Sequence, residues 1–413
     1  MKSIFPLLIK AHNTTSSLQR VSNKQLKQLL TKLADRIVDN TAPLLKANAK
    51  DLAKQSAGNI NTDRLMLNEQ RIKNIAASIK KIASLPDPSG KILEKRTLPN
   101  GLLLEKMSVA LGVVGAIYES RPNVTFDIAA LCLRSRNACV LKGSAEAEHT
   151  NLFSVKLIKA VLKEQGFEPD AVTLLPSARE VVEQLFTATK YVDVLIPRGS
   201  DGLIKYVRKN SEVPVIETGA GVCHVYVESK ANLNKALKIV VNAKTSRPSV
   251  CNAADAILID KKIAAPFLKL LQPEFEKYKV EVFADRESYS LLKGYSLLEH
   301  ATPDDFGKEF LSMKCAIKIV KNADEALDHI AKYSTRHSEA IVSENKILCE
   351  RFINEVDAAV VYSNSSTRFT DGEEFGLGAE IGISTQKLHA RGPFALEKLV
   401  TEKWIVRGNG QIR

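Results

Sequence analysis

Short apolar segments alternate with helix-like stretches through most of the chain, and this alternation restricts the fold more than any other feature. The first series of apolar segments lies at 113–119, 138–143, 171–176, 192–197 and 213–219. The second series lies at 255–260, 280–285, 316–320, 339–343 and 358–363. Strands that alternate with helices imply parallel sheets with helical crossovers. The sequence therefore predicts two α/β units joined near residues 220–225.

The first hundred residues are predicted to be mainly helical. One apolar stripe at three- and four-residue steps consists of Leu26, Leu29, Leu30, Leu33, Ile37 and Val38, and a second consists of Ile72, Ile75, Ile79 and Ile82. Both stripes are typical of amphipathic helices that pack on a core. Further on, Pro99-Asn100-Gly101 lies between alternating segments in 96–110. This pattern predicts a β-hairpin.

The composition is that of a soluble globular protein with two or more domains: 413 residues, 45% hydrophobic and 26% charged. No stretch has the length of a membrane span and the start lacks a signal-like pattern, so we expect a cytoplasmic protein without a membrane partner. The six cysteines are Cys132, Cys139, Cys223, Cys251, Cys315 and Cys349. They form no CxxC pair and no Cys/His cluster with zinc spacing, so neither disulfides nor a metal site is predicted.

The net charge of +12 favours anionic partners. A nucleic-acid-binding protein would concentrate its basic residues in one stripe with interleaved aromatics. Here 59 basic residues are mixed with 47 acidic ones, and aromatics make up only 6%. We therefore expect small anionic ligands and no nucleic acid.

Four loops follow predicted strands, at the edge of a parallel sheet where ligands collect. They span 118–127, 141–151, 196–210 and 216–224. Neither GxGxxG nor GxxxxGK[ST] is present, and each loop alone is typical of an ordinary strand-to-helix turn. Because several of them combine small residues with Lys or Arg, together they predict a site for a phosphorylated cofactor.

Cys251 lies in NAKTSRPSVCNAAD, residues 242–255, among small and polar neighbours. A single cysteine is often a packed core thiol, whereas a nucleophile needs a polar, partly open setting such as this one. Cysteine nucleophiles perform acyl transfer through thioesters. Beside a dinucleotide-binding sheet, that chemistry suggests oxidation or reduction of a thioester.

The segments YESRPNVT, IPRGSDGL, ETGAGVCH, NAKTSRPSVCNA, STRFTDG and EFGLGAEIGISTQKLHARGP resemble the gamma-glutamyl phosphate reductases, or glutamate-5-semialdehyde dehydrogenases. This family is a branch of the aldehyde dehydrogenase superfamily. The resemblance covers nearly the whole chain and is weakest in the first hundred residues. It implies an α/β, aldehyde-dehydrogenase-like fold with three parts. These are a Rossmann-like NADPH-binding domain (1–95 and 111–222), an α/β catalytic domain (223–385) and a small β oligomerisation element (96–110 and 386–413).

The resemblance implies NADPH-dependent reduction of L-glutamyl 5-phosphate to L-glutamate 5-semialdehyde, with release of phosphate. This is the second step of L-proline biosynthesis from glutamate. A homo-oligomer is also implied, and a transient contact with glutamate 5-kinase is left open.

Cys251 matches the nucleophile of the family, which forms a thioester. The oxyanion donors would be the Cys251 backbone N–H and a side chain of the 118–125 loop, where gapless alignment leaves Arg121 and Asn123 as alternatives. Glu217 matches the general base that hydrolyses the thioester in other aldehyde dehydrogenases. Because a reductase must avoid that hydrolysis, the role of Glu217 is left open.

By the same resemblance, the cofactor-binding residues are Lys142, Gly143, Ser144, Arg198, Gly199, Ser200 and Glu309, of which Glu309 matches the acid that holds the nicotinamide ribose. Ala145 replaces the acidic residue of NAD-preferring relatives, which favours NADPH, although Glu146 and Glu148 lie close by. Candidate substrate-binding residues are Arg247, Arg368, His389 and Arg391, with Lys387 in the same motif. Arg368 and Arg391 suit the α-carboxylate, and ion pairing is the alternative role for the LHARGP residues.

Three other functions are weighed against this one. In a hydrolytic aldehyde dehydrogenase, Glu217 would be the base, but the Arg-rich loops and the RPSVCN flank favour a phosphate-bearing substrate. A nucleic-acid-binding protein would need a clustered basic face. A non-catalytic scaffold of the same family would not need Cys251 together with every surrounding loop.

Overall fold

The computed structural model describes residues 3–55 and 62–413, which form two compact units. Unit 1 contains the described residues up to Thr218, together with Gly376–Gly382 and Phe394–Arg413. Unit 2 contains Gly219–Phe375 and Ile383–Pro393. The chain therefore passes from unit 1 to unit 2 after Thr218 and returns to unit 1 at its C-terminus.

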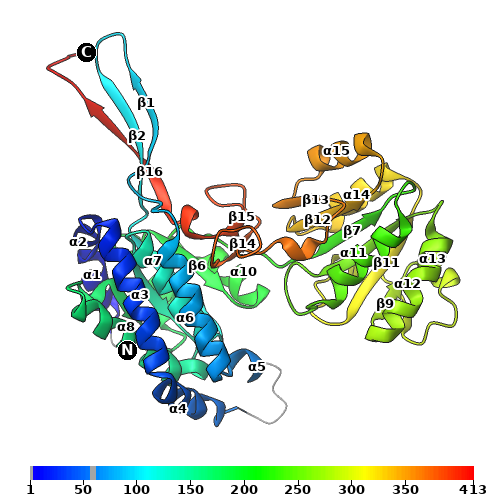
Figure 1. The fold of residues 1–413 in the computed structure, drawn as a ribbon, viewed down its shortest axis with the longest axis horizontal. Helices are drawn as coiled ribbons and strands as arrows, with labels where there is room; N and C mark the ends of the chain where they lie inside the picture. The colour runs from blue at the N-terminus through cyan, green and yellow to red at the C-terminus, as the bar shows by residue number, and fades with distance from the viewer. Residues whose placement is uncertain (1–2, 56–61) are drawn as a thin grey trace. The chain divides into compact units, whose positions relative to one another are not determined.

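Unit 1 has helices on both sides of its central sheet (Figure 1). Its α-helices are α1 (Phe5–Asn13), α2 (Thr15–Gln19), α3 (Asn23–Asp39), α4 (Thr41–Leu52), α5 (Thr62–Leu65), α6 (Glu69–Ser84), α7 (Pro122–Arg134), α8 (Glu148–Glu164), α9 (Val181–Phe186) and α10 (Asp201–Asn210). The 3₁₀ helices are η1 (Ala145–Ala147), η2 (Pro169–Ala171) and η5 (Leu396–Lys398). The two predicted apolar stripes lie on α3 and α6 and are buried, except for Val38, which is 42% exposed. Val38 lies outside the buried face because it directly follows Ile37 on a helix with 3.6 residues per turn.

The central sheet of unit 1 has the strand order β5-β4-β3-β6, and all of its neighbours are parallel. Its strands are β3 (Val113–Tyr118), β4 (Ala138–Lys142), β5 (Val172–Leu174) and β6 (Val194–Arg198), which confirms four predicted strands. The predicted strand at 213–219 is wrong, because only Val215 forms an isolated bridge, with Leu195. Pro214 lacks the N–H that a ladder would need at the preceding position.

A separate three-stranded sheet in unit 1, here called the arm, consists of β1 (Ile92–Thr97), β2 (Leu103–Ala110) and β16 (Val400–Arg407) (Figure 1). The pairing of β1 with β2 is antiparallel, and Thr97 lies opposite Leu103, so the predicted hairpin is confirmed. Gly101 has a φ of +83°, a conformation that glycine adopts without a steric penalty. The pairing of β16 with β2 brings the C-terminal segment to the hairpin.

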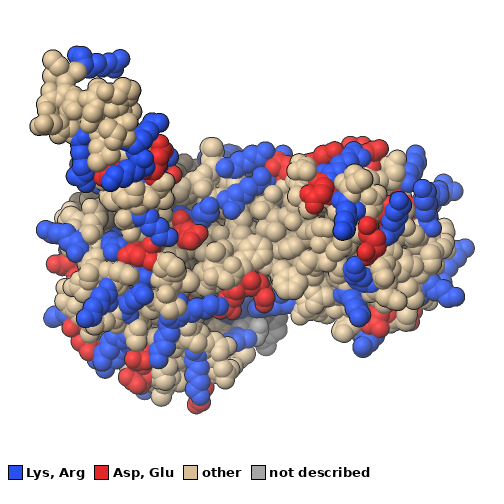
Figure 2. Space-filling model, turned by 45° about the horizontal axis from the view of Figure 1, so that its top comes forward, with Lys and Arg blue, Asp and Glu red and all other residues tan. Residues whose placement is uncertain are grey.

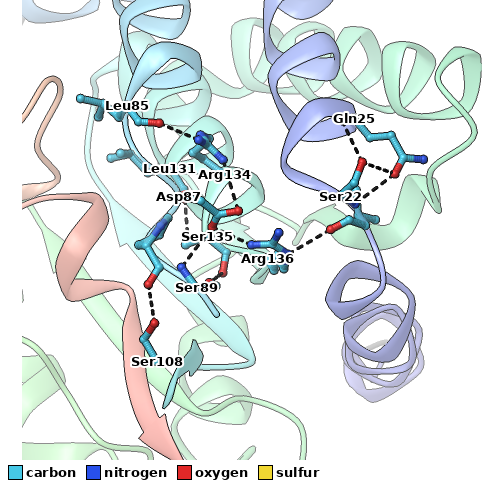
Figure 3. A network of polar contacts seen from close by, with 12 residues as sticks. Ser22, Gln25, Leu85, Asp87, Ser89, Ser108, Leu131, Arg134, Ser135 and Arg136 are labelled. Atoms are coloured by element: carbon cyan, nitrogen blue, oxygen red, sulfur yellow. Dashed lines mark hydrogen bonds and ion pairs between the residues drawn. The ribbon is translucent and has the colours of Figure 1, made fainter. Parts of the chain in front are cut away.

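A partly buried polar network holds the base of the arm (Figure 3). Asp87 accepts hydrogen bonds from Nη1 of Arg136 at 2.7 Å and from the backbone N–H of Ser89 at 3.0 Å. The fully buried Arg134 donates from Nη2 to the carbonyl of Leu85 at 2.6 Å. This network fixes the segment between α6 and β1 against the end of α7.

Unit 2 is built on a seven-stranded parallel sheet with the order β10-β9-β11-β8-β7-β12-β13. The strands are β7 (Cys223–Val227), β8 (Ala254–Asp260), β9 (Glu281–Ala284), β10 (Leu298–His300), β11 (Lys314–Val320), β12 (Ser338–Val342) and β13 (Val360–Ser363). Five of these strands were predicted. β7 and β10 were not predicted from the sequence. β7 carries the polar His224, which is buried. Its Nδ1 forms a hydrogen bond of 3.0 Å with Oε2 of Glu339 on β12.

Helices cover both faces of the unit 2 sheet. They are α11 (Leu233–Thr245), α12 (Ala264–Tyr278), α13 (Arg286–Leu291), α14 (Ala323–Tyr333) and α15 (Lys346–Glu355), with 3₁₀ helices η3 (Pro303–Gly307) and η4 (Thr367–Phe369). Residues of α11 and α12 belong to one apolar cluster with the sheet, and residues of α14 and α15 to another. Two short strands, β14 (Gly382–Ser384) and β15 (Gly392–Phe394), pair where the chain passes between the units. The predicted α/β fold is confirmed as a doubly wound arrangement.

Across the described residues, no helix combines the length and apolar character needed to span a lipid bilayer.

Candidate active site

Cys251 lies in a turn between α11 and the buried strand β8. The backbone N–H of Ala253 closes this turn by donating to the carbonyl of Val250 at 3.1 Å. All six cysteines lie in the described residues, and Cys251 is half-buried while the other five are buried. Access and a polar setting distinguish reactive thiols from packed ones. Cys251 is therefore the cysteine that a reagent or substrate can reach most easily.

The backbone of Cys251 packs directly against Gly221. A Cβ on Gly221 would lie 1.6 Å from the carbonyl oxygen of Cys251 and 2.9 Å from its Cα. Any larger residue would therefore displace the cysteine turn. The N–H of Gly221 donates to Oε1 of Glu309 at 2.8 Å. The carboxylate predicted to bind the cofactor ribose is thus linked to the turn that carries Cys251.

A second thiol contacts the same turn. Sγ of Cys223, the first residue of β7, donates to the carbonyl oxygen of Cys251 at 3.2 Å. Burial raises the pKa of Cys223 well above its usual value, and the charges of Glu339 and Asp255 act in the same direction. Cys223 is therefore a protonated donor at neutral pH, in contrast to what a thiolate nucleophile requires.

Asn252 anchors the other side of the turn to the STRFTDG segment. Its Nδ2 donates to the carbonyl of Thr370 at 2.9 Å and to that of Arg368 at 3.3 Å. The hydroxyl of Thr367 donates to the carbonyl of Asn252 at 2.7 Å. Two segments more than a hundred residues apart in the sequence are thereby fixed to each other.

Two arginines lie at this turn. Arg368 is half-buried, and its Nε donates to the hydroxyl of Ser246 at 3.0 Å. Burial lowers the pKa of Arg368, the charge of the exposed Arg247 lowers it further, and the charges of Asp371 and Cys251 oppose this change. The guanidinium of Arg368 is therefore close enough to interact electrostatically with the guanidinium of Arg247 and with the thiol of Cys251.

The LHARGP residues are arranged differently. Asp357 accepts from Nη2 of Arg391 at 2.7 Å and pairs with Nζ of Lys387 at 2.9 Å. Hydrogen bonds from Lys387 and then Arg391 lower the pKa of Asp357 to about 2. His389 has a φ of +62° in the loop between these two cations. Of the two roles considered for Arg391 and Lys387, the structure shows the ion pair.

In unit 1, the loop 118–125 leads into α7. Arg121 is the residue that precedes this helix, and Pro122 is its first residue. The exposed Asn123 donates from Nδ2 to Oδ2 of Asp127, one helical turn further on, at 3.0 Å. The amide predicted as an oxyanion donor is therefore engaged within its own helix.

The loop 142–144 ends β4. Lys142 is buried, which lowers its pKa, and its Nζ donates to the carbonyl of Ser177 at 3.0 Å. A Cβ on Gly143 would lie 2.2 Å from Nδ2 of Asn151, so any larger residue there would displace this buried side chain. The hydroxyl of Ser144 is buried and has no hydrogen-bond partner within the described part of the chain.

The loop 198–200 follows β6 and contains an acidic contact that the sequence did not suggest. Glu119 accepts from the backbone N–H of Ser200 at 2.8 Å and from its hydroxyl at 2.9 Å. A Cβ on Gly199 would lie 2.5 Å from Oε2 of Glu119. Two donors predicted to bind the cofactor are thus bound by a carboxylate of the same unit.

Glu217 lies in unit 1, close to the point where the chain leaves it. Its carboxylate accepts from Nη1 of Arg208 at 3.3 and 3.4 Å, and its side chain is 16% exposed. The predicted site residues thus form two groups by unit. Unit 1 holds Arg121, Asn123, Lys142, Gly143, Ser144, Arg198, Gly199, Ser200 and Glu217, and unit 2 holds Arg247, Cys251, Glu309, Arg368, His389 and Arg391.

Comparison with known proteins identifies the family. Residues 11–289 match the model of the aldehyde dehydrogenase family. A gamma-glutamyl phosphate reductase of Chlorobium chlorochromatii is 51% identical over 396 residues, which are 95% of this chain and 94% of that protein. The crystal structure of gamma-glutamyl phosphate reductase from Thermotoga maritima superposes with a TM-score of 0.96 at 39% identity and covers 100% of both chains.

The chain belongs to the gamma-glutamyl phosphate reductases.

An acetylating aldehyde dehydrogenase from Geobacillus thermoglucosidasius, at 15% identity and a TM-score of 0.70, shares the fold over 99% of this chain and 97% of its own. The aldehyde dehydrogenase family implies a nicotinamide cofactor. The loop 142–144 fits such a group, because the buried Lys142 is a cation and Ser144 offers an unused hydroxyl. Here Lys142 would neutralise a cofactor phosphate, and Ser144 would hydrogen-bond to it.

Sequence reasoning about this chain missed Cys223, Glu119 and Thr370. Cys223 and Glu119 stand inside quoted motifs, ETGAGVCH and YESRPNVT, but local patterns do not show which distant group each one contacts. One signal was present: a buried strand that begins with Cys-His needs polar partners for both side chains.

Proposed function

We propose that this enzyme reduces L-glutamyl 5-phosphate to L-glutamate 5-semialdehyde with NADPH and releases phosphate, as the second step of proline synthesis. Cofactor binding is assigned mainly to unit 1 and acyl transfer to unit 2, where Glu309 is also kept as the acid proposed to hold the nicotinamide ribose. The observation that carries the proposal is the half-buried Cys251, held in a rigid turn beside two arginines. The names of its relatives supply the substrate.

The reaction would begin with attack of the Cys251 thiolate on the acyl carbon of the acyl phosphate. The bond between that carbon and the bridging oxygen then breaks, phosphate leaves with the electron pair, and a thioester remains on Cys251. The positive charge of Arg368, which interacts with Cys251, would favour the thiolate, and the charges of Arg247 and Arg368 would attract the phosphate group of the substrate.

When bound, NADPH supplies the hydride that reduces the thioester carbonyl. The backbone N–H of Cys251 would donate to the oxyanion that forms. Arg121 and Asn123 stay the alternatives for the side-chain donor. Collapse of this tetrahedral species breaks the C–S bond, regenerates the Cys251 thiolate and releases the aldehyde. The firmly held cysteine turn keeps its N–H oriented through both steps.

Arg368 is proposed to bind the α-carboxylate of the substrate. It is half-buried at the cysteine turn, its Nε donates to Ser246, and its Nη1 and Nη2 make no hydrogen bond to the residues that the structure describes. Arg391 is less suited, since its Nη2 pairs with Asp357. A guanidinium with a free edge can hold a carboxylate through two parallel hydrogen bonds.

NADPH is proposed over NADH because Ala145 leaves no carboxylate to repel a 2′-phosphate. The neighbouring Glu146 accepts a hydrogen bond from the hydroxyl of Ser120, which directs that acid toward the 118–125 loop. The positive charge of Lys142, in the same loop, also suits the 2′-phosphate that NADPH has and NADH lacks.

The arm is proposed to mediate self-association. Its exposed apolar side chains include Ile92, Leu93, Trp404 and Val406, with exposed fractions of 46% to 57%. Large apolar side chains exposed on a sheet are typical of interfaces between subunits. Residues 96–110 and 386–413 would then form the oligomerisation element, to which β1 adds its first residues.

Two other functions have less support. Hydrolysis of the thioester would need Glu217 as a base, but this carboxylate is paired with Arg208. A nucleic-acid-binding surface would be a continuous basic region, whereas basic and acidic side chains are interspersed on the face shown in Figure 2.

The test uses the reverse reaction. Glutamate 5-semialdehyde and NADP⁺ are supplied with and without inorganic phosphate, and reduced cofactor is followed by absorbance for wild type and Cys251→Ala. The buried Cys315→Ala is the matched control. We expect phosphate-dependent turnover that Cys251→Ala abolishes and Cys315→Ala retains, with NADP⁺ preferred over NAD⁺.

Turnover that is indifferent to phosphate would overturn the proposal in favour of a hydrolytic dehydrogenase. In that case Glu217→Gln should abolish turnover, whereas a reductase should tolerate this substitution. Wild-type turnover retained by Cys251→Ala would exclude the thioester.

A further inference from the structure

We infer that Cys223 is a positioning residue that orients the Cys251 nucleophile by hydrogen-bonding to the carbonyl oxygen of Cys251. The inference goes beyond the proposed function and rests on its assignment of Cys251 as the nucleophile. Cys223 itself would make no contact with the substrate.

The contact has the geometry of a thiol hydrogen bond. Sγ of Cys223 lies 3.2 Å from the Cys251 oxygen and 3.7 Å from Nδ1 of His337. The imidazole nitrogen already has a closer partner, the hydroxyl of Ser338 at 2.8 Å. Burial keeps the Cys223 thiol protonated, so its S–H can point at the carbonyl.

Cys223 is also connected to Asn252, the residue after Cys251, through buried groups. The path runs from Cys223 to His337 and then to Ser338, whose hydroxyl lies 2.7 Å from the hydroxyl of Thr370. The backbone carbonyl of Thr370 accepts from Nδ2 of Asn252, the residue that follows Cys251, at 2.9 Å. The chain of contacts therefore closes on the residue next to the nucleophile.

This arrangement restricts the peptide that joins Cys251 to Asn252. Its carbonyl oxygen is held by Cys223 and is blocked on another side by the backbone of Gly221, where even one Cβ would lie 1.6 Å away. Rotation of this peptide would turn the Cα of Cys251 and thereby move both its thiol and its backbone N–H. One buried hydrogen bond thus bears on the two groups of Cys251 that react with the acyl group.

To orient Cys251 in this way, residue 223 must have a short side chain that donates a hydrogen bond. A serine would keep an O–H donor at nearly the same place, whereas an alanine would leave the Cys251 carbonyl without it. Unit 2 provides a matched control in Cys349, a buried cysteine whose Sγ donates to the carbonyl of Ser343 at 3.5 Å. Cys349→Ala therefore removes the same kind of contact away from the cysteine turn.

The experiment compares full-length Cys223→Ala, Cys223→Ser and Cys349→Ala with wild type. The first readout is the rate at which iodoacetamide alkylates Cys251, followed by mass spectrometry of its peptide, which needs neither substrate nor cofactor. The second is kcat and KM in the reverse reaction, and the third is Tm. Failure of the proposed function would abolish only the second readout.

We expect Cys223→Ala to lower the alkylation rate of Cys251 and kcat by about tenfold, with KM little changed, since a lost buried hydrogen bond corresponds to roughly that factor. Cys223→Ser should stay within about threefold of wild type, and Cys349→Ala should match wild type in both rates. The inference is overturned if Cys223→Ala behaves like Cys349→Ala. It is also overturned if serine fails to restore the rates, because packing volume would then explain the loss.

Discussion

The loops that follow the strands of the two units are held in different ways. In unit 2, the turn around Cys251 is fixed by buried and mostly uncharged partners, including Cys223, Thr367 and Thr370. In unit 1, the donors of Ser200 are bound by the carboxylate of Glu119 in an exposed contact. The turn around Cys251 is therefore held rigidly. The loop of Ser200 is held by the carboxylate of Glu119, which an anionic ligand can displace.

This difference corresponds to two kinds of chemistry. A covalent nucleophile must keep one geometry through several steps, and small displacements are costly in rate. A phosphate-binding loop must exchange its partners in every cycle, and exposed ionic contacts are weak enough to allow this. The comparison thus predicts that substitutions around Cys251 change kcat, while those around Ser200 change cofactor affinity.

The largest effect is expected at Gly221. Gly221→Ala places a Cβ 1.6 Å from the Cys251 carbonyl and should lower kcat by about 100-fold, because a shift of about 1 Å at the reacting group has that effect. Gly307→Ala is the control, since its Cβ would meet Tyr333 at an ordinary 3.5 Å. A kcat within twofold of wild type would show that the turn is not locked.

A substitution at Asp87 tests whether unit 1 also contains a rigid region. This region would lie at the base of the arm, apart from the loops that are proposed to bind the cofactor. Burial alone would raise the pKa of Asp87, but hydrogen bonds from Arg136 and Ser89 and the charge of Arg134 lower it overall. Asp87→Asn should lower the free energy of unfolding by about 1–3 kcal/mol and leave kcat unchanged. Chemical denaturation measures this loss.

The contribution of Asp87 should depend on pH. Its pKa in the folded chain lies below that in the unfolded chain, so the stabilisation is fully present above the unfolded value of about 3.9. It is lost as the pH falls through the lower, folded value. The difference in unfolding free energy between wild type and Asp87→Asn should therefore be larger at pH 6 than at pH 3. If this difference were the same at both pH values, the negative charge of Asp87 would not be the cause of the stabilisation.

A substitution at Arg368 tests how much the positive charge beside the Cys251 turn contributes to substrate binding and to the reactivity of Cys251. Arg368→Gln should raise KM for glutamate 5-semialdehyde about tenfold, because the α-carboxylate loses a charged partner. It should also slow alkylation of Cys251, since a positive charge close to the thiol is lost. Arg286→Gln, an exposed position at the start of α13, is the control. An unchanged KM would mean that a residue other than Arg368 binds the α-carboxylate.

The smallest effect is expected at Glu119. Glu119→Gln should tighten NADP⁺ binding about threefold, because the variant loses a negative charge that competes with the cofactor for the donors of Ser200. Isothermal titration measures the Kd, with the exposed Glu183→Gln as the control. Weaker binding would mean that Glu119 presents Ser200 to the cofactor instead of competing for it.

Much of the fold could be predicted because the signals are local. Nine of the ten predicted strands are present, and the hairpin around Asn100 follows from a turn signal between alternating segments. The exception at 213–219 contains Pro214, whose missing N–H interrupts the ladder. The candidate nucleophile was also accessible to sequence reasoning, since its polar flank is written in adjacent residues.

By itself, the sequence determined the alternation of strands and helices, the hairpin of the arm and the polar setting of Cys251, because each depends on neighbours within a few positions. Only the tertiary structure decided which distant groups meet. Cys223 contacts Cys251 from 28 positions away, Asp357 pairs with Arg391 from 34, and Glu119 binds Ser200 from 81. Periodicity records which face of an element is buried, but the partner across a sheet or loop is chosen by the packing of the whole unit.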